Sequence, residues 1–404
     1  MIIGPRQPDV LCFGGEDWWY HNRGHIDMQL MRQYAKHGTV LYVNSIVMQK
    51  PNLRKGRQFA AKLVRKGKSI FTGMKKTEAG FWVYSPVTLP VHHFPRARRL
   101  HETSLRFQVR RAAHSLQMRD PLVWVACPAA CDTAIRLNAN KLIYQRTDRF
   151  EEYPNVDAET IADYDRKLKA AADLTLFVNE TLFDEERQQC QSAIYLDHGV
   201  DFTRFAGAEN DPEIPGDIKN ISNPIVGFFG GIDSHTTDMH LVETLIDSLP
   251  EMNFVFVGKA SIDCAEWLTR KNVWILGQKP YEHIPHYGKC FDVAIMPWRE
   301  NRWIQACNPI KLKEYLALGK PVVSTPFPEL QKYHEVVYAS DTAEAFCENI
   351  RLALSQDSPQ RMAARKDRVK GASWQAKARK VLDSLFEENP SPPEDDSRWL
   401  MSTH

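Results

Sequence analysis

The feature that most constrains the fold is a series of short, almost continuous apolar runs, most of them separated by stretches with helical periodicity. The first half of the chain contains DVLCFGG, TVLYVNS, LVWVACP, KLIYQRT, LTLFVNE and AIYLDHG. The series restarts at residue 224 with PIVGFFGG, NFVFVGK, NVWILGQ, DVAIMPW, KPVVST and HEVVYAS. Strands that are apolar along their whole length are typical of parallel sheets covered by helices on both faces. The sequence therefore predicts an α/β chain with two doubly wound, Rossmann-like domains.

The length and the breaks in the pattern place these domains along the chain. A chain of 404 residues is long enough for two domains of this kind. Residues 206–222 are rich in Gly, Pro, Asn and Asp and are interpreted as a linker. We therefore expect one domain at 1–205 and a second at 223–370. Residues 387–404 are rich in Pro and acidic residues, which is typical of a mobile tail.

Charge is unevenly distributed, although the net charge is only +2. Residues 1–150 hold 25 Lys/Arg against 9 Asp/Glu, and the rest of the chain holds 27 against 41. No acidic residue occurs between Met28 and Thr77. This asymmetry indicates that the first half meets an anionic partner, such as a membrane surface or nucleic acid. A solvated basic face without a partner is the alternative.

The N-terminus and the cysteines predict a cytoplasmic protein. The start, MIIGPRQPDVLCFGG, lacks the charged segment and long apolar core of a signal peptide. No apolar run approaches the ~20 residues needed to span a bilayer. The closest of the eight cysteines, Cys127 and Cys131, have a CPAAC spacing that fits neither a zinc ribbon nor a redox motif. Reduced, mostly buried thiols are expected.

Loops that follow strands are the expected ligand-binding loops, because ligands of doubly wound sheets bind beyond the carboxyl ends of the strands. In the second domain these loops begin in GFFGG, VGK, LGQKPYEHIP and MPWRENRW. Glycines let the backbone approach a phosphate, although a tight turn explains a glycine pair about as well. The candidate residues in these loops are Gly230, Gly231, Lys259 and Gly277.

The segment NPIKLKEYLALGKPVVSTPFPEL, residues 308–330, predicts a helix whose N-terminal end faces an anionic ligand. Asn308 is a candidate cap, and Gly319 ends the helix. Lys311 and Glu314 lie one turn apart on the helix surface. A lysine here can bind phosphate oxygens, and a carboxylate can accept hydrogen bonds from the two hydroxyls of a ribose. The alternative is a surface ion pair worth a few tenths of a kcal/mol.

The same segment resembles the donor-site helix of glycosyltransferases with the GT-B fold, especially family 4, where the phrase is close to K-x-x-E-Y-L-A-x-G-K-P-V-V. DHGVDFTRF, at 197–205, is similar to the family's N-G-V-D-x-x-x-F. KPYEHIPHYGKCFDVAIMPW is similar to the loop, helix and strand before the donor helix. In the first half, GHIDMQLMRQYAKHGTVLYVNS and KLIYQRTDRFEEYP resemble a bacterial polysaccharide branch, similar to enzymes of teichuronic acid or exopolysaccharide assembly.

The resemblance implies that the second domain binds a nucleotide-sugar and the first domain binds the acceptor. It also implies that a helix at 371–386 crosses back to the first domain. No metal or other cofactor is expected, because helix dipoles and Lys or Arg stabilise the leaving diphosphate. The chain departs from family 4 at Ala306, where the family has its first Glu, and at GGIDSHTTDMH, where an Arg and a Lys are usual. These departures leave the stereochemical outcome open.

Two stretches of the first half supply candidate residues for the acceptor side. Asp148 follows the KLIYQRT strand and is the candidate base for the acceptor hydroxyl, an effect of about 10²–10⁴-fold on rate. A helix cap, or a partner for Arg146 or Arg149, is the alternative role. The loop GGEDWWYHNRGH combines aromatic and polar groups that suit a sugar ring, although such loops also often serve packing. Its candidate acceptor-binding residues are Gly15, Asp17, Trp18 and His25. Asp17 and His25 are also rivals of Asp148 for the role of base.

These observations predict a metal-independent glycosyltransferase of the hexosyltransferase type. It is expected to move a sugar from a nucleotide-sugar to a lipid-linked or polysaccharide acceptor in envelope or exopolysaccharide synthesis. The alternatives are a nucleotide-sugar epimerase of the same fold, a basic nucleic-acid-binding protein and a non-catalytic glycan-binding relative. No motif of a known nucleic-acid-binding module is present. The presence of both Lys311 and Glu314 weighs against the non-catalytic alternative.

The basic residues predict attachment to the inner face of the cytoplasmic membrane. Ten Lys/Arg and no acid occur between Lys50 and Lys76, with apolar residues interspersed. A second basic helix is expected to carry Arg106, Arg110 and Arg111. Such segments lie on anionic lipid with the apolar side down, each Lys/Arg contributing about 1 kcal/mol. The alternatives are a solvated basic surface and direct binding of an anionic glycan.

Overall fold

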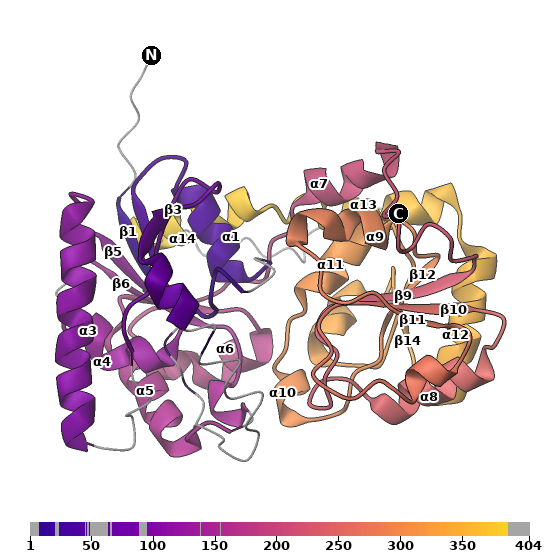
Figure 1. Cartoon of the computed structure of the whole chain (residues 1–404), viewed down its shortest axis with the longest axis horizontal. Coiled ribbons are helices and arrows are strands. Elements are labelled where there is room, and N and C mark those ends of the chain that lie inside the picture. The colour runs from indigo at the N-terminus through magenta and orange to yellow at the C-terminus, as the bar shows by residue number, and fades with distance from the viewer. Residues whose placement is uncertain are drawn as a thin grey trace, which may run out of the picture.

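The computed structural model shows two α/β bodies side by side, with the first half of the chain in one and most of the second half in the other (Figure 1). The expected tail at 387–404 and most of the basic stretch between 50 and 76 lie outside the described residues. The described residues are 8–20, 24–44, 46, 48, 64, 67–88, 95–137, 139–153 and 155–386.

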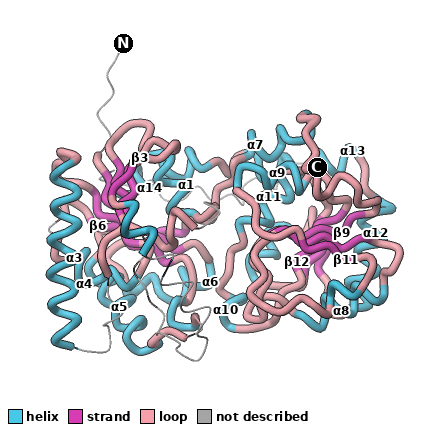
Figure 2. The backbone as a smooth tube through the Cα atoms, viewed as in Figure 1, coloured by secondary structure: helices cyan, strands magenta, loops and turns pink. Residues whose placement is uncertain are grey.

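An eight-stranded sheet forms the centre of the first domain (Figure 2). Its order is β3-β4-β2-β1-β5-β6-β7-β8, and every pair is parallel except β3 with β4. The strands are β1 (Val10–Phe13), β2 (Val40–Val43), β3 (Met74–Lys76), β4 (Trp82–Tyr84), β5 (Leu122–Val125), β6 (Leu142–Arg146), β7 (Leu174–Phe177) and β8 (Ala193–Tyr195). The helices are α1 (Ile26–Tyr34), α3 (Pro95–Ser115), α4 (Cys131–Ile135), α5 (Ala158–Ala171) and α6 (Glu180–Glu186), with 3-10 turns η2 (Pro128–Ala130), η3 (Phe150–Glu152) and η4 (Arg187–Gln189).

A six-stranded, wholly parallel sheet forms the second domain, in the order β11-β10-β9-β12-β13-β14. The strands are β9 (Ile225–Phe229), β10 (Asn253–Val257), β11 (Val273–Ile275), β12 (Val293–Met296), β13 (Val322–Ser324) and β14 (Tyr338–Ala339). The helices are α7 (Phe202–Gly207), α8 (Met239–Ser248), α9 (Ile284–Gly288), α10 (Arg302–Gln305), α11 (Ile310–Ala317), α12 (Ala343–Gln356) and α13 (Pro359–Lys370), with 3-10 turns η5 (Ala208–Asn210), η6 (Trp267–Thr269), η7 (Tyr281–His283) and η8 (Pro328–Tyr333).

The predicted fold class is confirmed. All twelve apolar runs form strands, and strands β1, β2, β5, β6 and β7 are buried along their whole length, as a sheet covered on both faces requires. The two strands that the apolar pattern missed, β3 and β4, lie at the edge of the first sheet. One of them reads Met-Lys-Lys, so it has no apolar run to reveal it.

The passage between the domains differs from the expected linker. Val200 and Phe205, expected at the end of the first domain, belong to the hydrophobic core of the second. Ile218 and Ile221, within the expected linker, are buried in the same core. The predicted boundary at residue 205 is therefore wrong, because apolar side chains inside a segment of turn-forming residues still anchor it to the sheet that follows.

The last described helix, α14 (Trp374–Phe386), packs on the first domain beside α1 (Figure 1). Trp374, Ala378 and Val381 are buried in the same cluster as residues of β1 and α1. The Tyr34 hydroxyl of α1 donates to the Ala378 carbonyl at 3.1 Å. The chain thus ends its described part on the domain in which it began.

All eight cysteines are free thiols, and six of them are buried. Within the described ranges, none of the helices has both the length and the apolar character that crossing a bilayer demands.

Candidate active site

Helix α11 is held by its apolar face and ended by a glycine. Tyr315 and Leu316 are buried in the core of the second domain. The amide of Gly319 donates to the Leu316 carbonyl at 2.9 Å, and the Lys320 amide donates to the Tyr315 carbonyl at 2.9 Å. Gly319 has φ +74°, and a Cβ there would lie 2.5 Å from Met362 Cγ. These contacts fix the end of α11 and so the position of its first turn.

The amine of Lys311, in that first turn, lies at the carboxyl end of β9 and forms no ion pair within the part of the chain that the structure describes. Its Nζ lies 4.2 Å from the centre of the Phe228 ring and 5.6 Å from that of Trp298. No carboxylate of the described residues comes within ion-pair distance of it, and burial lowers its pKa to about 8. Gly230 makes room for the amine, since a Cβ there would lie 2.3 Å from Nζ. An anion brought to this point would meet an uncompensated cation.

Glu314 lies one turn further along α11 and is only 5% exposed. Its Oε1 has no hydrogen-bond partner. Burial raises the pKa of Glu314 to about 7, against the opposing effects of the Tyr281 hydroxyl and Lys311. The surface ion pair considered as an alternative is therefore absent: Glu314 is buried and is not paired with Lys311. An unpartnered buried acceptor costs about 1–3 kcal/mol, which a ligand hydroxyl would recover.

Asn308 does not cap α11. The N-cap residue is Pro309, and no side chain caps the helix. Instead the Asn308 side-chain amide donates to the Val178 carbonyl of the first domain at 2.8 Å. In the same contact the Asn179 amide donates to the Cys307 carbonyl at 3.4 Å. The sequence prediction was wrong because the partner lies in the other domain, and the pair of bonds docks the start of α11 against the end of β7.

The remaining candidates of the second domain lie in loops after its strands. Gly230 and Gly231 follow β9, and Gly277, with φ +72°, follows β11. Lys259 follows β10 and is exposed. Desolvation raises the pKa of Glu16 in the first domain, and the positive charges of His25 and, more weakly, Lys259 oppose the rise. The charge of Lys259 therefore acts on a residue of the first domain.

Asp148 follows β6 in the first domain and is 9% exposed. Burial raises its pKa to about 6, opposed first by His25 and then by the Tyr153 hydroxyl, which donates to Oδ2 at 3.3 Å. Neither alternative partner binds it: Arg146 pairs with Glu151, Asp165 and Glu186, and Arg149 pairs with Glu185. Asp148 is thus a largely ionised carboxylate at neutral pH that forms no salt bridge with the described residues, as a general base requires.

Asp148 faces the second domain at the loop that leads into α11. Its charge raises the pKa of the Cys307 thiol there, after the larger effect of burial. Beside it, the rings of Tyr153 and Trp303 lie 6.0 Å apart across the domain boundary. The structure therefore brings Asp148 and the first turn of α11 to the same interdomain site.

His25 belongs to a partly buried ion pair that sequence reasoning missed. Its Nδ1 lies 2.5 Å from Oδ1 of Asp27, which is fully buried. Asp27 also accepts hydrogen bonds from the Gly15 amide at 2.8 Å and the Tyr42 hydroxyl at 2.9 Å. Burial lowers the pKa of His25, but Asp27 outweighs this and raises it to about 9; the pKa of Asp27 falls to about 2. His25 is therefore an imidazolium at neutral pH, and its charge acts on Asp148. In the sequence, the pair was indicated only by the His-x-Asp spacing at the start of a helix.

Trp18 and Asp17 hold the loop together. Trp18 is 2% exposed, and its ring packs edge-on against Phe81 at 4.7 Å. The expectation that Trp18 stacks on a sugar is therefore wrong. Asp17 accepts hydrogen bonds from the Trp19 amide at 3.0 Å and the Ser69 hydroxyl at 3.1 Å. Of the four candidates on the acceptor side, His25 is the one that interacts electrostatically with Asp148.

One carboxylate ties α11 to the last helix. Asp197, after β8, binds the ammonium groups of Lys313 on α11 and Lys377 on α14. Lys313 is 2% exposed and also donates to the His198 carbonyl. The pKa of Asp197 falls well below its usual range because the two cations outweigh its burial. The donor-side helix is thereby fixed to both domains.

Comparison with known proteins agrees with this architecture. Residues 223–356 match the family model described as glycosyl transferases group 1. The Bacillus subtilis (strain 168) protein TuaH, provisionally named a teichuronic acid biosynthesis glycosyltransferase, is 30% identical over 141 residues. This match spans 34% of the chain and about a third (35%) of that relative.

Solved structures match over nearly the whole chain. Sucrose-phosphate synthase from Thermosynechococcus elongatus has a TM-score of 0.68 at 14% identity, over 93% of this chain and 98% of that one. HepE of Anabaena, in complex with UDP-glucose, has a TM-score of 0.63 at 13% identity, over 94% and 99%. These likenesses show the fold, which is the GT-B fold of glycosyltransferases.

Proposed function

We propose that this chain, which has the GT-B fold and a group 1 glycosyl transferase domain at residues 223–356, transfers a sugar from a nucleotide-sugar to an acceptor hydroxyl. The observation that carries the proposal is the pair on α11: a Lys311 amine with no ion pair among the described residues, and a buried Glu314 carboxylate whose Oε1 has no hydrogen-bond partner. A nucleoside diphosphate offers the phosphate and the ribose diol that would satisfy both groups.

The chemistry divides between the two domains. Asp148 accepts the proton of the acceptor hydroxyl as that oxygen bonds to the anomeric carbon of the sugar. The bond from the anomeric carbon to the diphosphate oxygen breaks, and Lys311 stabilises the charge on the leaving diphosphate. The neighbouring His25 imidazolium adds a second cation at the same interface. In this proposal, charged side chains of the protein stabilise the leaving diphosphate, and no metal ion is required.

The names of the related proteins indicate which donor and which acceptor to propose. TuaH is named for teichuronic acid biosynthesis, and the HepE structures hold UDP and UDP-glucose. We therefore propose a uridine-type donor and an acceptor that is a lipid-linked or polysaccharide glycan of the cell envelope. A thermal-shift screen with UDP, GDP, dTDP and CMP tests the donor, since a ligand that binds the folded state raises the unfolding temperature. Release of an interconverted sugar without transfer would instead identify an epimerase.

Replacement of either group on α11 should weaken nucleotide binding. Glu314→Ala removes the ribose acceptor, and Lys311→Ala removes the phosphate partner. Hydrogen bonds to charged groups contribute roughly 1.5–3 kcal/mol, so calorimetry should show an affinity about tenfold lower or more for each variant. Lys271→Ala, at an exposed site in the same domain, should bind like wild type. Wild-type affinity in both α11 variants would mean that the nucleotide binds elsewhere.

A membrane-facing surface on the first domain would hold the enzyme beside a lipid-linked acceptor. Leu100 and Phe107, seven residues apart on α3, are 74% and 66% exposed. Arg110 and Arg111 are exposed on the same helix. Large apolar side chains that stand in solvent among basic residues are typical of a surface that rests on anionic lipid. We propose that the first domain binds the inner face of the cytoplasmic membrane in this way.

Sedimentation with liposomes measures this attachment. Wild type should bind anionic vesicles and not neutral ones, and high salt should release it, because surface charges are screened. Leu100→Gln with Phe107→Gln, or Arg106, Arg110 and Arg111 changed to Gln, should weaken binding severalfold. The same is expected of Gln at Arg54, Lys55, Lys62, Arg65 and Lys66, which lie outside the described residues.

Leu352→Gln with Arg351→Gln, on α12 of the second domain, is the matched control and should leave vesicle binding unchanged. Equal binding to neutral vesicles, or no binding to anionic ones, would contradict the proposed attachment.

A further inference from the structure

A cavity lies away from the interdomain site, at the end of the second sheet where its strands begin. Its volume is about 450 Å³, within the usual range of small-molecule sites. Ile225 starts β9, Asp292 immediately precedes β12, and Lys320 lies two residues before β13, so the cavity opens at the amino ends of these strands. The segment 209–223 forms the opposite wall. Ligands of the transfer reaction bind at the carboxyl ends, so this cavity has no part in that reaction.

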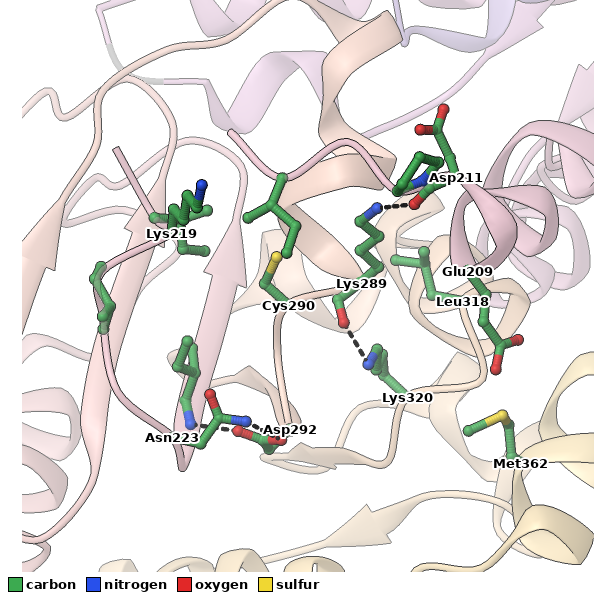
Figure 3. Close-up of a pocket in the computed structure, with 15 residues that line it drawn as sticks. Glu209, Asp211, Lys219, Asn223, Lys289, Cys290, Asp292, Leu318, Lys320 and Met362 are labelled. Carbon is green, nitrogen blue, oxygen red and sulfur yellow. Dashed lines mark hydrogen bonds between the residues drawn. The ribbon is translucent and has the colours of Figure 1, made fainter. Parts of the chain in front are cut away.

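The lysines that line this cavity have no acidic partners. Figure 3 shows Lys289 and Lys320 joined through the Lys289 carbonyl, which accepts from Lys320 Nζ at 2.7 Å. Lys289 Nζ in turn donates to the backbone carbonyl of Asp211. Lys219 stands on the far wall. No ion pair of the described residues involves any of the three, and burial lowers the pKa of Lys320.

The acids of the lining, by contrast, are already engaged. Glu209 pairs with Lys366 at 2.5 Å. Asp211 contacts His286 at 3.1 Å. Asp292 accepts hydrogen bonds from the Asn223 side-chain amide at 3.2 Å and the Ile225 amide at 2.7 Å. Each acid of the lining thus has a side-chain or amide partner, whereas Lys289 and Lys320 donate to backbone carbonyls and keep further N–H donors.

Apolar side chains form the rest of the lining. Ile218, Ile221 and Leu318 of the lining are buried, and Ile214, which also lines the cavity, is 47% exposed. A polar anion alone would leave this surface in contact with water, whereas an anion with an apolar body would cover it.

We propose that this cavity binds a small amphipathic anion, with a phosphate or carboxylate head at Lys289 and Lys320 and an apolar body against the isoleucines. The ammonium groups keep their carbonyl bonds and still have free N–H donors for the head group, since each lysine has three. Binding here does not depend on the transfer reaction proposed above.

Cys290 reports directly on occupancy, because its partly exposed thiol lines the cavity. Cys190 is the other partly exposed cysteine and lies in the first domain, so it is an internal control. The rate of maleimide modification is followed at each cysteine by mass spectrometry, with hexyl phosphate, hexanoate, inorganic phosphate or hexanol present at millimolar concentration. We expect hexyl phosphate or hexanoate, or both, to slow modification of Cys290 at least fivefold while Cys190 is unaffected. The anion that protects Cys290 more strongly identifies the preferred head group as phosphate or carboxylate.

Lys289→Gln with Lys320→Gln should abolish this protection, whereas Lys271→Gln, at an exposed site outside the lining, should retain it. Calorimetry of wild type with hexyl phosphate and hexanoate gives the same ranking without any variant. Equal protection by hexanol, protection by inorganic phosphate alone, or no protection by either amphipathic anion would overturn the proposal. So would full protection in the double lysine variant.

Discussion

Asp148→Asn should lower turnover by at least about 100-fold while nucleotide binding persists. The substitution keeps the shape of the side chain and removes the proton acceptor, whose loss typically costs 10²–10⁴-fold. Burial, opposed by His25 and Tyr153, sets the pKa of Asp148 at about 6. Turnover of the wild-type enzyme should therefore decline as the pH falls below about 6, where the base becomes protonated. Steady-state rates from pH 5 to 8, with nucleotide affinity measured in parallel, provide the check.

Asp120→Asn is the matched control for this experiment. Asp120 is exposed and has φ +42°, a conformation that asparagine also adopts readily. Its substitution should leave turnover unchanged. Near-normal turnover in Asp148→Asn would refute the role of base. An inverted anomeric configuration in the product would agree with a protein base, whereas a retained one would favour transfer on the front face without it.

Asp27→Asn should lower the free energy of unfolding by about 3 kcal/mol at pH 6. The pKa of His25 rises from 6.5 to about 9 in the folded protein, because Asp27 outweighs the opposing effect of burial. Each pKa unit corresponds to about 1.4 kcal/mol of stability. Because the folded-state pKa is the higher one, this stability is fully present below about pH 6.5 and is lost as the pH rises through about 9. In the variant, burial is opposed only by the weaker effects of Glu16 and Asp148 on His25, so this decline should become much smaller.

Urea unfolding from pH 5 to 9.5 measures both effects. Asp163→Asn is the control, since Asp163 pairs with Lys167 on the exposed face of α5 at 2.6 Å. That exposed pair should contribute a few tenths of a kcal/mol. If the two variants lose equal stability, or if Asp27→Asn retains the full decline toward pH 9, then the buried pair does not hold a charged imidazole.

The apolar runs predicted the strands well because a parallel sheet with helices on both faces needs strands without a polar side. At one edge of the first sheet, β3 and β4 were missed because β3 reads Met-Lys-Lys and each strand is only three residues long. The boundary between the domains was misplaced because Val200 and Phe205 follow the first domain in sequence but pack in the second. Local composition does not show which of two cores an apolar side chain will join.

The candidate site was predictable where one element fixes the geometry. The spacing on α11 placed Lys311 and Glu314 together, although it did not show that Glu314 is buried without a partner. It was not predictable where distant elements meet. Asn308 binds the other domain instead of its own helix, and Trp18 turns into the core instead of toward solvent. Asp27 is typical of the first turn of any helix, so only its contacts reveal its effect on His25.

The return of α14 to the first domain limits how such enzymes can be recombined. A chimera that joins the first domain of one relative to the second domain of another has its natural junction near residue 200. With that single junction, the foreign second half also brings a foreign α14, whose Trp374 and Val381 must fill a core shaped for another sequence. Exchange of donor specificity between relatives therefore needs two junctions, the second before residue 374, so that the last helix keeps its original partner α1.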